Sequence, residues 1–226
     1  MKPLVIFDWD GTLMNSVPRI VTAMRSAAAE LGIPVFSPET VRNIVGLGLP
    51  EAIQQLAPQL DEAQANALRA AYIHHFVSAE EQQPAPPLFE GVESGLNRLS
   101  EAGITLAVAT GKSEKGLRRA FSHAPQIAAL FSAYRTADKT KSKPSPLMLQ
   151  QLMQELSFTP EQTLMVGDSE YDIAMGAAAG ATPLGVDWGV HSPERLKAQG
   201  AQQVVTHFDE LVTLLLDHAS GASVPV

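Results

Sequence analysis

The chain has 226 residues, of which 45% are hydrophobic and 18% charged, so it can bury a large core and is too apolar for wholesale disorder. Its 24 acidic residues outnumber its 16 lysines and arginines. The resulting net charge of -8 provides no basic surface for nucleic acid or an anionic membrane, and neither is an expected partner. The absence of cysteine excludes disulfide scaffolds, thiolate zinc sites and cysteine nucleophiles.

Short apolar runs that end in polar, glycine-containing loops recur along the chain. The first run, residues 4–7, is too short for a secretory signal or a membrane span, and we expect a cytoplasmic protein. Helical patterns alternate with the apolar runs, which predicts right-handed βαβ units on a parallel sheet buried on both faces. The predicted strands are 4–7, 104–109, 163–166 and 182–186, and the predicted helices beside them are 92–101, 113–121, 146–156, 171–179 and 208–218.

The segment between the first two strands has a different texture, because helical patterns follow one another there without a strand. It is far too long for an ordinary strand-to-helix connection, so we interpret it as an inserted domain. The expected fold is therefore an α/β protein with a Rossmann-like parallel sheet core, residues 1–15 and 84–226, and an inserted α-helical domain, residues 16–83. Its predicted helices are 17–31, 38–45, 50–57 and 62–79, the expected linkers are 13–16 and 80–88, and residues 220–226 are expected to form a frayed tail.

Two acids directly follow the first strand. Asp8 and Asp10 are separated by one residue, a spacing that suits a nucleophile beside a general acid/base. Turn formation by the same residues is the alternative for this motif taken alone. In open parallel sheets, ligands bind beyond the carboxyl ends of the strands, which is where these acids are expected to lie.

Three further motifs are expected at the same edge of the sheet. Thr110 and Gly111 end the second strand just before a helix, where a hydroxyl and a backbone N–H can bind an anion, although a simple helix cap has the same sequence. Lys143 lies in a proline-fixed loop and is useful near a phosphate, unless it is merely part of a solvated basic loop. Asp168 and Asp172 follow a later strand and offer hard oxygen ligands for Mg²⁺, or helix N-caps.

The conjunction of these motifs favours the functional interpretation. Four carboxylates converging on one pocket would repel one another and a phosphate, so the arrangement requires a divalent cation and a lysine for balance. The ordered motifs resemble those of the haloacid dehalogenase superfamily of phosphohydrolases, and the helical insertion resembles the small α-helical cap of its phosphoglycolate phosphatase-like branch. The four motifs that carry the resemblance are, in chain order, Asp8-Trp9-Asp10-Gly11-Thr12-Leu13, Thr110-Gly111, Lys143-Pro144 and Gly167-Asp168 with Asp172.

The resemblance implies a role for each motif. Asp8 would attack phosphorus to form an aspartyl phosphate, and Asp10 would protonate the leaving oxygen and then deprotonate the hydrolytic water. Thr110, the Gly111 amide and Lys143 would hold the phosphoryl oxygens. The implied Mg²⁺ ligands are Asp8, the Asp10 carbonyl and Asp168, with Asp172 behind them or reaching the metal through water. The sequence departs from the branch at Trp9, where Phe is usual, and at Gly111, where many relatives have Asn.

Candidates for substrate specificity are less distinctive. The helical pattern breaks at Gly46 in a segment that resembles the specificity loop of the cap, although an ordinary helix connection is the alternative. Arg42 and Arg19 are basic candidates for a substrate carboxylate or second phosphate, and each is equally compatible with a solvated helix residue. Lys112, next to Gly111, is the remaining basic candidate.

These observations predict a Mg²⁺-dependent phosphatase of a small phosphorylated metabolite, acting as a monomer or homodimer. A phosphomutase or a pyrophosphatase of the same superfamily is the alternative. A non-catalytic phospho-signalling protein is less compatible, because receiver domains are shorter and lack the helical insertion. A dehalogenase is disfavoured because that branch needs neither metal nor the second aspartate, which is present here as Asp10.

Overall fold

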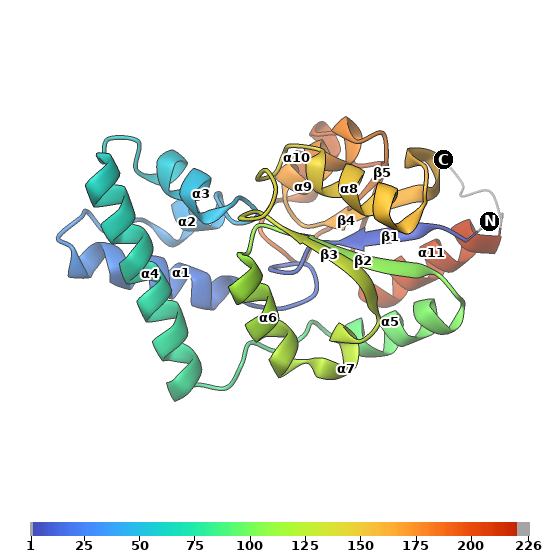
Figure 1. Ribbon diagram of the computed structural model, residues 1–226, viewed down its shortest axis with the longest axis horizontal. Helices are drawn as coiled ribbons and strands as arrows, with labels where there is room; N and C mark the ends of the chain where they lie inside the picture. Colours follow the sequence, from blue (N-terminus) through green and yellow to red (C-terminus); the bar gives the residue numbers. More distant parts are fainter. Residues whose placement is uncertain (1, 221–226) are drawn as a thin grey trace.

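A computed structural model describes residues 2–220 of the chain (Figure 1). Its core is a six-stranded parallel sheet in the order β3-β2-β1-β4-β5-β6. The central strand β1 is fully buried because it pairs with β2 on one side and β4 on the other. The strands are β1 Leu4–Phe7, β2 Thr105–Thr110, β3 Phe131–Thr136, β4 Thr163–Gly167, β5 Thr182–Val186 and β6 Gln203–Val205.

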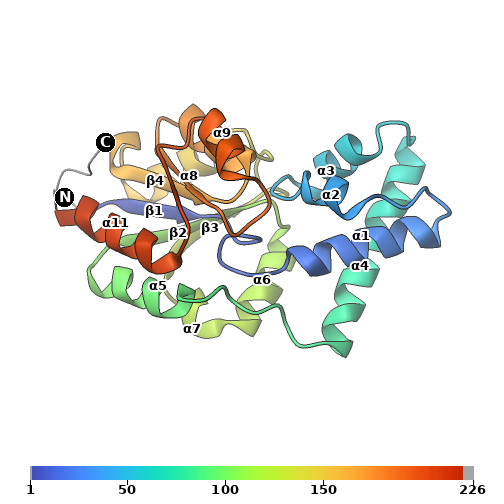
Figure 2. The same cartoon turned by 180° about the vertical axis from the view of Figure 1, so that it is seen from behind.

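Helices cover both faces of this sheet and create two apolar clusters. Helices α5 (Val92–Glu101), α6 (Glu114–His123) and α11 (Phe208–Ser220) pack on one face of the sheet, which lies below the strands in Figure 2. Helices α8 (Leu147–Leu156) and α9 (Glu170–Ala178) pack on the other. This arrangement confirms the α/β core with a buried parallel sheet, and the short helices α7 (Pro125–Ala128), α10 (Pro193–Ala198) and η1 (Pro160–Gln162) complete it.

The inserted domain is a group of four helices with an apolar cluster of its own. The long helix α4 crosses α1 and packs against it, and the smaller helices lie beside them (Figure 1). A capping box in which Asp61 and Gln64 bond reciprocally begins α4. We refer to this group as the cap; its helices are α1 Val17–Glu30, α2 Pro38–Arg42, α3 Leu49–Leu56 and α4 Glu62–Gln82.

The two chain segments that join cap and core run side by side. The Asn15 N–H donates to the Pro87 carbonyl at 2.9 Å, and the Phe89 N–H donates to the Leu13 carbonyl at 3.0 Å. Since both crossings are hydrogen-bonded to each other, the cap is attached to the core through one double-stranded neck. The structure therefore places the cap directly over the carboxyl ends of the strands (Figure 1).

Several sequence expectations need correction. Strands β3 and β6 were not predicted, because both lie at sheet edges and lack the continuous apolar run of a strand buried on both faces. Helix α2 ends at Arg42 and not at residue 45, and α4 continues to Gln82, into the predicted linker. Ser220 is the last residue of α11 and not part of a frayed tail, while residues 221–226 lie outside the described residues. Within residues 2–220, no helix has both the length and the apolar character required to cross a bilayer.

Candidate active site

The loop after β1 turns sharply and places Asp8 and Asp10 at the carboxyl edge of the sheet. The Asp8 N–H continues the strand pairing by donating to the Val166 carbonyl at 2.9 Å. Gly11 then adopts a left-handed conformation with φ +84°. A Cβ atom at Gly11 would lie 2.3 Å from Asp168 Oδ2, so only glycine lets this loop pass so close to the third acid.

Three buried carboxylates meet at this point. Oxygen atoms of Asp8, Asp168 and Asp172 lie within 4.8 Å of one another, and none of the three residues is more than 1% exposed. The Lys143 ammonium is also buried and lies 2.7 Å from Asp8 Oδ1 and 2.6 Å from Asp172 Oδ1. The cluster therefore combines three acidic groups with a lysine that contacts two of them, whereas the sequence motifs predicted four converging carboxylates, with Asp10 as the fourth.

Burial and mutual repulsion shift the protonation of this cluster. Burial raises the pKa of Asp8 to about 7, against the attraction of Lys143 and with further repulsion from Asp172. The pKa of Asp168 is likewise raised, first by burial and then by the charges of Asp172 and Asp8. Burial opposes the charged form of Lys143, but Asp172 and Asp8 outweigh it and raise the pKa of the ammonium. The cluster thus holds more negative charge than its lysine balances.

This donor set fits a divalent cation. Asp8 Oδ2 is buried and accepts no hydrogen bond from any described residue. Carboxylate oxygens are the ligands that Mg²⁺ prefers, and a cation among the three acids would offset their mutual repulsion, which adds to burial in raising the pKa values of Asp8 and Asp168. The acidic triad is therefore a candidate metal site formed by Asp8, Asp168 and Asp172.

Hydrogen bonds from neighbouring groups orient the carboxylates of Asp168 and Asp172. Thr12 Oγ1 donates to Asp168 Oδ1 at 2.7 Å, and the Val190 N–H donates to Asp168 Oδ2 at 3.0 Å. Ser169 Oγ donates to Asp172 Oδ2 at 2.6 Å. Sequence reasoning did not single out Ser169 or Val190 for this role. The N-cap position of Ser169 was a usable signal, whereas a backbone N–H donor such as that of Val190 leaves no mark in the sequence.

The side chain of Asp10 lies apart from the acidic triad. Its Oδ1 atom accepts a short hydrogen bond from Ser16 Oγ and lies 2.9 Å from Lys112 Nζ. Asp10 lines the cavity described below and its carboxylate is not among the three clustered acids. This position suits proton transfer to a ligand in the cavity, and it leaves the Asp10 carbonyl as the group through which the predicted metal contact would be made. Ser16 was not predicted as a site residue.

Thr110 and Gly111 line the same cavity as Asp10, on the side formed by the core, which we call the floor of the cavity. The Thr110 side chain is buried at the end of β2 and accepts a hydrogen bond from the Lys112 N–H at 3.2 Å. Helix α6 starts directly beyond it, with Ser113 as the N-cap. At Gly111 a Cβ atom would lie 2.4 Å from the Leu47 carbonyl oxygen, so the cap loop that contains Gly46 and Leu47 rests on this glycine.

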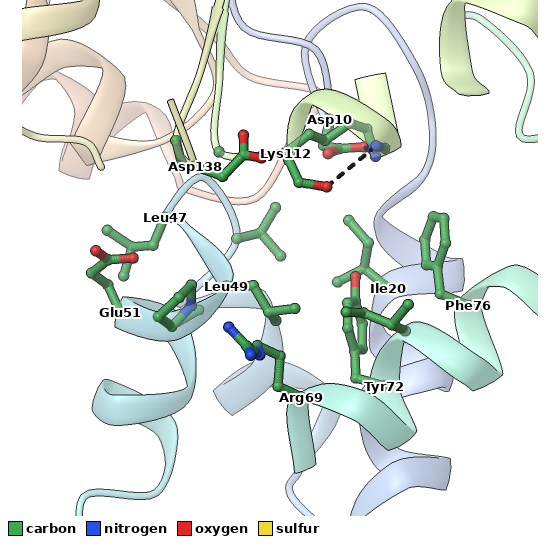
Figure 3. Close-up of a pocket in the computed structure, with 18 of the residues that line it drawn as sticks. Asp10, Ile20, Leu47, Leu49, Glu51, Arg69, Tyr72, Phe76, Lys112 and Asp138 are labelled. Atoms are coloured by element: carbon green, nitrogen blue, oxygen red, sulfur yellow. Dashed lines mark hydrogen bonds and ion pairs between the residues drawn. The ribbon is translucent and has the colours of Figure 1, made fainter. Parts of the chain in front are cut away.

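A cavity of about 490 Å³ separates the core from the cap (Figure 3). The core contributes Asp8, Asp10, Thr110, Gly111 and Lys112, so five of the predicted site residues share this space. Of the cap candidates, Gly46 lines the cavity. Arg42 is exposed and is not among the lining residues, and Arg19 donates to the Pro84 carbonyl instead. The cap residues that do line it include Ile20, Leu49, Arg69, Tyr72, Ile73 and Phe76, none of which was predicted.

Residues 5–186 match the family model of the haloacid dehalogenase-like hydrolases. The chain belongs to this family. It is 37% identical over 217 residues to a protein of Dickeya dadantii described as probable phosphatase IndB, with 94% of this chain and 93% of the relative covered. It is also 33% identical over 218 residues to phosphoglycolate phosphatase of Vibrio cholerae, with 94% and 95% covered. A solved structure from Clostridium acetobutylicum, described as a predicted phosphatase, superimposes with a TM-score of 0.85 at 26% identity and covers 96% of this chain and 99% of its own.

Proposed function

We propose that this haloacid dehalogenase-like hydrolase is a Mg²⁺-dependent phosphatase that hydrolyses a small phosphorylated metabolite through an aspartyl phosphate. The observation that carries the proposal is the buried cluster of Asp8, Asp168 and Asp172 around Lys143, directly below the cavity. The relatives described as phosphatases agree with it. We also infer that the enzyme works in the cytoplasm, which its acidic, cysteine-free composition favours, as a monomer or homodimer.

The metal site belongs to the proposal as well. Asp8, Asp168 and the Asp10 carbonyl would hold Mg²⁺, with Asp172 behind them. When bound, Mg²⁺ supplies positive charge between the carboxylates and the incoming phosphoryl group. Without that charge the acids would repel a phosphate dianion, because Lys143 alone does not balance three carboxylates.

The chemistry of the chain itself follows from two carboxylates with different surroundings. An Asp8 oxygen attacks phosphorus, the bond between phosphorus and the ester oxygen breaks, and an acyl phosphate forms on Asp8. The Asp10 carboxyl gives its proton to the departing alkoxide and later removes a proton from the water that attacks the acyl phosphate. That second displacement releases inorganic phosphate and restores the Asp8 carboxylate.

The remaining floor residues hold the phosphoryl group. Lys143 keeps Asp8 in place through Oδ1 and is close enough to share its charge with a phosphoryl oxygen. The Thr110 hydroxyl already accepts the Lys112 N–H, so its own hydrogen is available to donate to phosphate. The Gly111 N–H lies at the entrance to α6, where backbone donors favour an anion.

The test is phosphate release by the wild type and Asp8→Asn from small phosphate esters and pyrophosphate, in Mg²⁺ and in EDTA. Turnover should require both Mg²⁺ and Asp8, and Asp8→Asn should lose at least about a thousandfold while it remains folded, because it removes the nucleophile. Appreciable turnover by a folded Asp8→Asn variant would overturn Asp8 as the nucleophile. Isomerised sugar phosphate without free phosphate would indicate the mutase, and a stable aspartyl phosphate without turnover would indicate a signalling protein.

A further inference from the structure

The cavity is much larger than a phosphoryl group and a short acid require. Its volume of about 490 Å³ lies within the range of pockets that enclose drug-sized ligands, roughly 300–1,000 Å³. Phosphoglycolate, the substrate in the names of several relatives, carries only a carboxymethyl group beyond its phosphate. Such a ligand would leave most of the space above the floor to water.

The cap wall of this cavity is mostly apolar, and Glu51, Asn66 and Arg69 are its charged and amide side chains. Ile20 comes from α1, Leu49 from α3, and Tyr72 and Phe76 from α4 (Figure 3). Ile73 of α4 also lines the cavity. Ile73 is 45% exposed, although it is a large apolar side chain. Since exposed apolar groups that line a pocket lose their water when a ligand covers them, this wall favours an apolar ligand body.

The Lys112 ammonium, on the core side of the cavity, already has two interaction partners. Lys112 Nζ lies 2.9 Å from Asp10 Oδ1 and 5.2 Å from the centre of the Phe76 ring. The ammonium therefore has an ionic partner on the core side and an aromatic partner on the cap side. A substrate carboxylate close to the phosphate would have to compete with Asp10 for this lysine.

Arg69 is a second cationic side chain that lines the cavity, on the cap side opposite Lys112. It lies on α4 and points into the cavity across from Asp10 and Lys112 (Figure 3). It forms no hydrogen bond or ion pair with any side chain that the structure describes. A guanidinium in this position is suited to a carboxylate at the far end of a ligand, with which it can form two parallel hydrogen bonds.

We propose that the substrate is a phosphate monoester whose alcohol has an apolar, ring-sized body and a carboxylate at its far end. The phosphate lies over Asp8, the body covers the wall formed by Ile73 and Phe76, and the carboxylate reaches Arg69. This assignment rests on the proposed phosphatase function and adds the class of substrate to it.

The test compares three esters of primary alcohols, namely phosphoglycolate, benzyl phosphate and para-carboxybenzyl phosphate. We expect kcat/KM for benzyl phosphate to exceed that for phosphoglycolate by about tenfold or more, because only the ring covers the apolar wall. The para-carboxylate should add roughly tenfold again through its charge-assisted hydrogen bonds to Arg69. Equal or better hydrolysis of phosphoglycolate would overturn the inference while leaving the phosphatase function intact.

Two cap variants test the two parts of the site separately. Arg69→Gln should lower the ratio of kcat/KM for para-carboxybenzyl phosphate over benzyl phosphate from about tenfold to about one. Ile73→Asn should lower kcat/KM for both benzyl esters by about threefold to tenfold relative to kcat/KM for phosphoglycolate. Val35→Asn is the matched control, because Val35 is a similarly exposed apolar residue of the cap, 50% exposed, that does not line the cavity. If Arg42→Gln and not Arg69→Gln removes the carboxylate preference, the position of the anion is wrong.

A binding measurement separates this inference from catalysis. Calorimetric titration of the wild type with benzylphosphonate and methylphosphonate in Mg²⁺ compares the two ligand bodies without turnover. Tighter binding of benzylphosphonate, weakened in Ile73→Asn, would support the apolar subsite even if no ester in the panel were hydrolysed, an outcome that would overturn the proposed function alone. Equal affinities would overturn the subsite.

Discussion

The two sides of the cavity, which we call the core wall and the cap wall, differ in the kinds of side chain that form them. On the core side, Asp8, Asp168 and Asp172 are buried; Asp8 and Asp168 follow strands β1 and β4, and Asp172 lies in the first turn of α9. On the cap side, apolar side chains and Arg69 project from helices that the double-stranded neck joins to the core. The cap also contacts the core through its loop on Gly111, through Asn43 and Gln55 at Tyr171, and through Phe76 at Lys112. Under the proposed function, the carboxyl edge of the sheet would carry the chemistry, and the cap helices would contribute to the choice of substrate.

The strongest test of the core wall is removal of its lysine. Lys143→Met should lower kcat by about a hundredfold to a thousandfold, because it removes a positive group from the phosphoryl site. It should also cost about 3–5 kcal/mol of unfolding free energy in EDTA, since Asp8 and Asp172 lose the one ammonium that contacts them within residues 2–220. Phosphate release and thermal melts in EDTA and in Mg²⁺ measure both effects, and Mg²⁺ should recover part of the stability.

Lys141→Met is the matched control for that experiment. Lys141 belongs to the same basic loop but is exposed, so its removal should leave both kcat and the melting temperature nearly unchanged. If Lys143→Met melts like the Lys141→Met control in EDTA, the lysine does not balance the acidic cluster in the folded protein.

The contact between the two walls is tested at Gly111. A Cβ atom there would come within 2.4 Å of the Leu47 carbonyl and 2.6 Å of the Gly46 carbonyl. Gly111→Ala should therefore push the cap loop away and lower kcat/KM by about tenfold to a hundredfold, because misplacement by about 1 Å is enough for such a loss. Steady-state kinetics on the preferred ester measure the effect.

Gly116→Ala provides the comparison for Gly111→Ala. Gly116 lies in α6, and a Cβ atom there meets nothing closer than 3.4 Å. This substitution should retain activity and stabilise the helix by about 0.5–1 kcal/mol. Unchanged kinetics for Gly111→Ala would mean that the cap loop does not rest on the core during turnover.

The difference between the walls also explains what the sequence could predict. Asp8, Asp10, Thr110, Asp168 and Asp172 were identifiable because each ends or follows a strand or lies at the start of a helix at a known edge of a parallel sheet. Lys143 lies in the loop between β3 and α8 and was identifiable only through its conjunction with the other motifs. The edge strand β3 escaped because Phe131–Thr136 mixes exposed and buried residues. Arg69 and Phe76 escaped because α4 is a surface helix in which cavity-facing and solvent-facing residues look alike until the opposite wall is known.

The smallest expected effect concerns the pH dependence of the metal-free core. The pKa of Asp8 is 3.8 in an unfolded chain and about 7 in the folded protein. Between these values the folded state binds the proton more tightly, so the contribution of Asp8 to stability is complete below pH 4 and is lost as the pH rises through 7. In EDTA the wild type should therefore melt at a lower temperature at pH 8 than at pH 5, by several degrees.

Asp8→Asn should shrink that difference, because it removes the titrating group and its repulsion of Asp172. Asp209→Asn, which neutralises an exposed carboxylate on α11, should leave the difference as in the wild type. Mg²⁺ should raise the melting temperature of the wild type more at pH 8 than at pH 5, since the cation binds the ionised acids and competes with their protons. A pH dependence that is the same in the wild type and Asp8→Asn would mean that the triad is already balanced without metal, and the charge argument for the core wall would fail.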